Sequence, residues 1–128
     1  KNMANMIKTT DYSKNQKQIL IGQESYYIAL PVLVSGTANS TIYAGQPVAG
    51  DITARDTAFT VPTAESDGNY KANGIILHDV VLDADGKGNA TLVLAACVDL
   101  LKLESAVQTF IGKSSGLDRI IFVKGSAI

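Results

Sequence analysis

The sequence has one cysteine, one histidine and almost no net charge, and each scarcity excludes a class of function. With Cys97 alone, no intramolecular disulfide can form and no cysteine cluster can bind zinc. With His78 alone, a conventional multi-histidine metal site is excluded as well. Cys97 lies in an apolar run without a cationic neighbour, which is typical of a small buried hydrophobic residue. We therefore expect no catalytic site, no metal and no other cofactor.

Charged residues make up 18% of the chain, and the formal net charge is -1. A protein that binds nucleic acid through bulk electrostatics carries a basic excess, so we expect no nucleic-acid partner. Apolar stretches such as Ile28–Val34 and Leu92–Val98 are too short to span a bilayer, so we expect no membrane partner. The N-terminus is polar and does not match a secretory signal, and we expect the chain to fold in a cytoplasmic compartment.

Hydrophobic residues amount to 46% of the 128 residues, which is enough for the core of one globular domain. From Ile19 onward the pattern is mainly β. The segment Ser25–Val34 is rich in β-branched and aromatic residues, and Pro31 places it at a sheet edge or divides it. After it we expect two short strands, Thr41–Tyr43 and Thr57–Val61, and then an exposed polar loop, Pro62–Asn69.

The two clearest strands are Gly74–Leu82 and Ala90–Val98, and the Gly/Asp-rich segment between them predicts a hairpin. The period then changes. Apolar residues recur at i, i+4, i+7 and i+8, which predicts a helix from about Leu100 to Ile111. Gly112 is placed to end this helix, and Arg119–Lys124 is predicted to form the last strand.

Two segments resemble ligand-binding motifs in part, and both fail at an identifiable position. Asp83–Gly88 opens like a calcium-binding loop, but Lys87 occupies the fifth ligand position and Leu94 the twelfth, where a glutamate is required. We interpret this segment as a hairpin turn. Gly112-Lys113-Ser114 resembles the end of a phosphate-binding loop, but Val107 stands where the first glycine is needed. The tripeptide also follows a helix instead of a strand.

His78 and Asp79 are adjacent, a pairing that suggests acid–base chemistry. Neighbours on a strand point to opposite faces of the sheet, however, so we interpret His78 as a structural residue at a strand edge or interface. One catalytic alternative stays open, because Cys97 and His78 lie on neighbouring strands of the predicted hairpin and could approach one another.

Residues 1–18 differ in composition from the rest of the chain, with four lysines against Asp11 and no sustained apolar period. One interpretation is a frayed terminus. The other is an arm that becomes ordered on a partner. In that second case its candidate contact residues are Met6, Ile7, Lys8, Tyr12, Lys14 and Lys17.

The order of several short segments is the most specific feature of the sequence. Ala44-Gly45-Gln46-Pro47-Val48 is followed by Ala72–Val80, a Gly/Asp turn, Ala90–Leu94, Cys97–Leu103 and finally Arg119–Lys124. This order resembles the head decoration (capsid-stabilising) proteins of tailed phages, in particular the lambda-like decoration family. The residues of this loop and strand that we single out are Ala44, Gly45, Pro47, Ala72, Gly74, His78 and Asp79.

The resemblance implies a β-tulip over residues 19–128, that is, a small barrel-like β domain with one short helix near the C-terminus. It implies a non-enzymatic structural protein of the virion that binds the outer surface of the expanded capsid as a homotrimer. The partner would be the major capsid protein, residues 1–18 would be the capsid-binding arm, and folding would occur in the host cytoplasm. Two alternatives stay open: the capsid-anchoring module of a head fibre, and a small enzyme or ligand-binding domain that uses Cys97 and His78.

Overall fold

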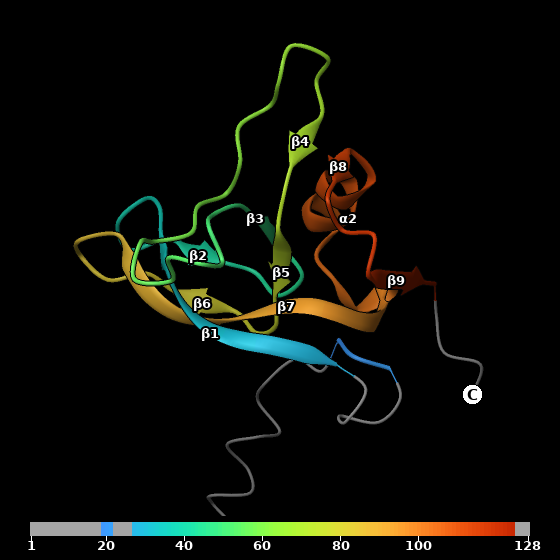
Figure 1. Ribbon diagram of the computed structural model, residues 1–128, viewed down its shortest axis with the longest axis horizontal. Helices are drawn as coiled ribbons and strands as arrows, with labels where there is room; N and C mark the ends of the chain where they lie inside the picture. The colour runs from blue at the N-terminus through green and yellow to red at the C-terminus, as the bar shows by residue number, and fades with distance from the viewer. Residues whose placement is uncertain (1–18, 22–26, 125–128) are drawn as a thin grey trace, which may run out of the picture.

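The computed structural model describes residues 19–21 and 27–124, and it folds this part of the chain mainly into strands (Figure 1). The elements in chain order are β1 (Ile28–Ser35), β2 (Thr41–Ile42), β3 (Pro47–Val48), β4 (Tyr70–Lys71), β5 (Gly74–Ile76), β6 (Val80–Val81), β7 (Lys87–Asp99), a 3₁₀ helix η2 (Leu100–Lys102), α2 (Ser105–Gly112), β8 (Ser114–Ser115) and β9 (Ile120–Val123). The expected mainly β fold with a short helix near the C-terminus is confirmed.

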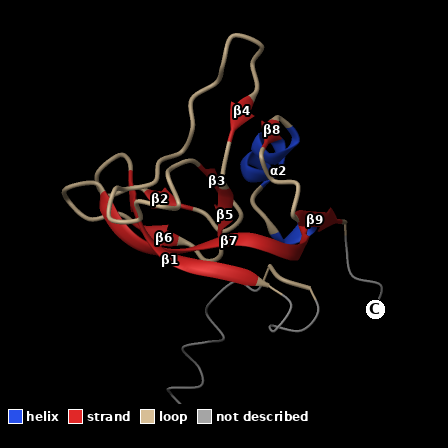
Figure 2. Cartoon of the chain, in the orientation of Figure 1, coloured by secondary structure: helices blue, strands red, loops and turns tan. Residues whose placement is uncertain are grey.

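The long strand β7 organises the main sheet, which has the order β1-β7-β5-β3 with β9 also paired to β7 (Figure 2). β1 runs antiparallel to β7 from Ser35 opposite Lys87 to Ile28 opposite Ala95. β5 runs antiparallel to β7, whereas β9 is parallel to its C-terminal part. Two further pairs, β2–β6 and β4–β8, form small separate sheets. Within the described residues these sheets form no closed barrel.

β1 lies at one edge of the main sheet, as Pro31 predicted, because proline has no N–H to give to a second neighbouring strand. The outer side of this edge is partly covered. Arg55 Nη1 donates a hydrogen bond of 3.1 Å to the Pro31 carbonyl. Phe59 bonds to the far end of the strand, through its N–H to Leu33 and its carbonyl to Ser35. The segment Thr57–Val61, predicted as a strand, forms only single β-bridges, from Phe59 to Val34 and from Thr60 to Ala49.

Two hydrophobic clusters fill the two faces of the main sheet. One gathers around Ile75, Val93 and Val98 and includes Val107 of α2. The other gathers around Phe59, Ile76 and Leu92. Neighbouring residues of β5 and of β7 belong to different clusters because successive side chains of a strand point to opposite faces. The sheet is therefore covered on both faces over its middle, and the loops are held against it by burial.

Two further predicted elements differ from the structure. The segment Gly74–Leu82 forms two strands instead of one. The first, β5, is paired with β7 and ends at Ile76; the second, β6, is paired with β2. The predicted helix from Leu100 to Ile111 is also divided. The Asp99 side chain accepts the Leu101 N–H at 3.0 Å and starts a single 3₁₀ turn. Leu103 then returns to an extended conformation with φ -93° and ψ 156°, so that α2 begins at Ser105.

Candidate functional site

The loop and strand that carry the family resemblance lie against one another. The Ala44 N–H donates to Asp79 Oδ1 at 2.8 Å, although the two residues are far apart in sequence. The Gly45 N–H donates to the Ile76 carbonyl at 2.6 Å, and the Ile76 N–H returns a bond of 3.1 Å to Gln46. These bonds explain why the chain bends between β5 and β6. The bend brings the Asp79 carboxylate to the start of the loop, where the carboxylate accepts the N–H of Ala44, a fully buried residue.

The glycines of this junction are required by close contacts. Gly45 has a φ of 89°, and a Cβ at this position would lie 2.6 Å from Leu103 Cδ2. Gly74 lies on β5, where a Cβ would meet the Val93 carbonyl oxygen at 2.6 Å. Leu103 belongs to the segment that follows β7, so three of the segments that carry the resemblance meet at one place. We name the contact of residues 44–48, 72–80 and Leu103 the junction.

The junction is an internal structure. Ala44 and Val48 are fully buried, Pro47 is among the most buried residues, and Ala72 is 6% exposed. Gly116 packs against the Ala72 carbonyl so closely that a Cβ could not be accommodated. Ala44, Pro47, Val48 and Ala72 therefore position other parts of the chain and present little surface to a partner, whereas Asn73 and Asp79 of the junction are exposed.

His78 and Cys97 do not form a catalytic pair. The register places Ile76 opposite Leu92, and the Leu77 N–H bonds to the Thr91 carbonyl at 3.0 Å, so His78 falls near position 90 of β7. Positions 90 and 97 of a strand are separated by about 23 Å at about 3.3 Å per residue. His78 Nδ1 is buried and has no hydrogen-bond partner among the described residues. The open alternative of a site built from His78 and Cys97 is therefore wrong.

The acidic loops form turns. Asp83 Oδ1 accepts the N–H groups of Asp85 and Lys87, each at 2.9 Å, as the interpretation of this segment as a hairpin turn predicted. Asp51 is exposed, and the hydroxyl of Thr53 donates to it at 2.6 Å. This hydrogen bond, followed by one from the Thr53 N–H, holds the pKa of Asp51 below its ordinary value. Across residues 19–21 and 27–124, no cluster of three or more metal-ligating side chains is found.

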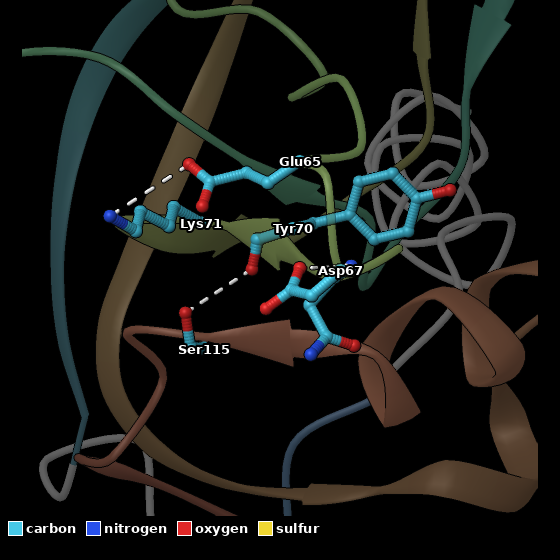
Figure 3. Close-up of polar contacts among 6 residues, drawn as sticks. Glu65, Asp67, Tyr70, Lys71 and Ser115 are labelled. Atoms are coloured by element: carbon cyan, nitrogen blue, oxygen red, sulfur yellow. Dashed lines mark hydrogen bonds and ion pairs between the residues drawn. The ribbon is translucent and has the colours of Figure 1, made fainter.

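A polar hollow of about 260 Å³ lies between the loop 65–69 and the turn 112–115. β4 and β8, which the sequence did not predict to pair, are parallel neighbours and contribute to its lining. In Figure 3 Glu65 and Lys71 face one another at 3.8 Å, and the Ser115 hydroxyl donates to the Tyr70 carbonyl at 3.3 Å. The Tyr70 ring stacks on Phe110. The carboxylates and ammonium groups of the lining balance in number, so the hollow has no net charge to select an ion.

Exposed apolar side chains are the other candidate contact surface. The largest exposed fractions belong to Val81 at 71%, Ile121 at 62%, Leu101 at 61% and Ile28 at 59%. Ile28 is paired with Ala95, and Ile121 with Cys97. Two of the four therefore lie across the same end of β7.

The candidate arm residues Met6, Ile7, Lys8, Tyr12, Lys14 and Lys17 lie outside the described residues. Comparison of the chain with protein-family models, with curated proteins and with solved structures found no match. In the part of the chain that the structure describes, no helix has the length and apolar character needed to cross a membrane.

Proposed function

We propose that this protein is a structural protein of a tailed-phage virion. It binds the outer surface of the expanded head as a homotrimer and stabilises it by bridging neighbouring major capsid subunits. The junction carries this proposal: loop 44–48, strand segment 72–80 and Leu103 are the parts of the sequence that resemble the decoration family, and they are bonded and packed together. The glycines, the proline and the aspartate of these segments thus have a role in holding together the framework of one small β domain.

The binding function needs no reactive group. A clamp on a head gains affinity from backbone pairing and small apolar anchors, and three linked copies multiply that affinity. Residues 1–18 supply an excess of lysines over Asp11, together with apolar residues such as Met6 and Ile7. This segment is the proposed arm, which contacts the major capsid protein.

Co-sedimentation with purified heads tests the proposal. We expect the full chain to sediment with expanded heads that lack it and to stay in the supernatant with unexpanded heads. Deletion of residues 1–18 should abolish sedimentation while leaving the circular dichroism spectrum of the domain unchanged. A truncated protein that binds as well as the full chain would contradict the role of the arm.

A further inference from the structure

The strand β9 has one edge that is open among the described residues, where its pairing is with β7 alone. The Arg119 carbonyl accepts the Ala96 N–H at 3.4 Å, and this bond determines which backbone groups of β9 face the parallel strand β7. Backbone groups alternate in direction along a strand, so those of Ile121 and Val123 point to β7. The N–H and carbonyl of Phe122 then point outward, where a further strand would bond to them.

Two of the edge strands of the main sheet, β1 and β9, are treated differently by the sequence. On β1, Pro31 removes a donor, Arg55 occupies a carbonyl and Phe59 bonds to the far end. These are the devices by which proteins prevent unwanted strand addition. β9 has the sequence Ile-Ile-Phe-Val and no proline or charge within it. An open, apolar edge of this kind favours pairing with another polypeptide.

The side chains beside this edge are apolar as well. Ile28 and Ala95 are paired, as are Cys97 and Ile121, so all four lie on one face across β1, β7 and β9. The core cluster on this face reaches only as far as Leu94. The solvated face of such a sheet normally carries polar residues, whereas Ile28 and Ile121 are 59% and 62% exposed here. A strand added to β9 would cover Ile121 and extend this apolar face.

The charges that flank β9 select the chemistry of the added strand. Arg119 and Lys124 are exposed at its two ends, and within the described part of the chain neither forms an ion pair. Antiparallel pairing with a second copy through the outward-facing backbone of Phe122 would bring Arg119 of one copy and Lys124 of the other to the same end of the pair, and like charges close together repel one another. The lysine-rich segment 1–18 is disfavoured for the same reason. The complementary strand carries carboxylates at its ends.

We propose that β9 is a docking edge to which an extended segment of the major capsid protein adds as a further strand. That segment has apolar residues in its middle and Asp or Glu opposite Arg119 and Lys124. This inference rests on the proposed function for the identity of the partner, while the edge and its charge preference follow from the strand itself. It gives the domain a contact with the capsid that is separate from the arm.

A peptide titration tests the edge directly. The probe is a short peptide of alternating valine and threonine with glutamate at both ends, added to the ¹⁵N-labelled full chain. We expect saturable shifts of the Phe122 and Lys124 amide signals and slower hydrogen exchange at Phe122. The Arg119→Glu/Lys124→Glu protein should lose this response and gain one to the same peptide with lysine at both ends. An unmoved Phe122 signal, or an equal response to both peptides, would overturn the proposal.

Head binding by the same variant separates this inference from the proposed function. We expect Arg119→Glu/Lys124→Glu to bind expanded heads about tenfold more weakly than the unmodified chain, because two favourable charge contacts become repulsive. Lys87→Glu/Lys113→Glu, which makes the same charge change away from β9, is the matched control and should bind normally. Equal binding by all three would refute the docking edge and leave the proposed function standing. Failure of the unmodified chain to bind heads would refute the proposed function, and the peptide result would then decide the edge alone.

Discussion

Replacing Gly45 with alanine tests the packing of the junction, and its cost follows from two separate effects. The φ of 89° is unfavourable for a residue with a side chain, at about 1–2 kcal/mol. The new Cβ would also lie 2.6 Å and 2.8 Å from the two methyl carbons of Leu103, which is 5% exposed and cannot easily move away. Overpacking of this kind adds about 1–3 kcal/mol. We expect Gly45→Ala to lower the free energy of unfolding by about 2–5 kcal/mol.

Gly68 provides the matched control, because its φ of 83° is nearly the same but a Cβ there meets nothing within 4 Å. Gly68→Ala should therefore cost only the backbone term, about 1–2 kcal/mol. The smaller flexibility of alanine in the unfolded chain affects both variants alike and cancels in the comparison. Urea unfolding followed by circular dichroism measures both values, and equal slopes against urea would show that the unfolded states are comparable.

The difference between the two variants isolates the contact of Gly45 with Leu103. Equal losses of stability for Gly45→Ala and Gly68→Ala would refute the close approach of the loop to Leu103. A double-mutant cycle sharpens the test, because Leu103→Ala opens the space that the new methyl group needs. We expect Leu103→Ala to cost less in the Gly45→Ala background than in the unmodified chain.

Two further side chains have measurable roles. Asp79→Ala leaves the buried Ala44 N–H without its acceptor and should cost about 1–3 kcal/mol in urea unfolding, whereas Asp79→Asn, which keeps an oxygen acceptor, should cost less; equal costs would contradict a hydrogen bond at this place. Thr53→Ala should raise the pKa of Asp51 toward its ordinary value in an NMR titration, because the hydroxyl donor is lost. Since the folded-state pKa of Asp51 is lowered, its stabilising contribution is present above about pH 3.9 and is lost as the pH falls through the folded-state pKa. A titration unchanged by Thr53→Ala would refute this assignment.

Local chemistry made part of the fold predictable from the sequence. Pro31 cannot donate to a neighbouring strand, and β1 is an edge strand. The carboxylate of Asp83 satisfies two backbone N–H groups, and the segment is a turn, as its composition predicted. In both cases the preference of one residue for its own backbone surroundings decides the result.

The errors arose where a long-range contact overrides the local pattern. His78 and Asp79 fit a strand, but Asp79 bends away to cap Ala44, which lies 35 positions earlier. The helical period from Leu100 is real, yet Leu103 turns inward against Gly45 and divides the helix. The parallel pairing of β9 with β7 and of β4 with β8 joins segments that share no turn, and no local signal marks it.

The central claim is that this domain binds the outside of an expanded phage head. Electron cryomicroscopy of expanded heads incubated with the full chain tests it most directly. We expect added density on the outer surface at three-fold positions of the lattice, with three copies in each cluster, and none on unexpanded heads. Bare expanded heads, or equal density on both kinds of head, would contradict the account.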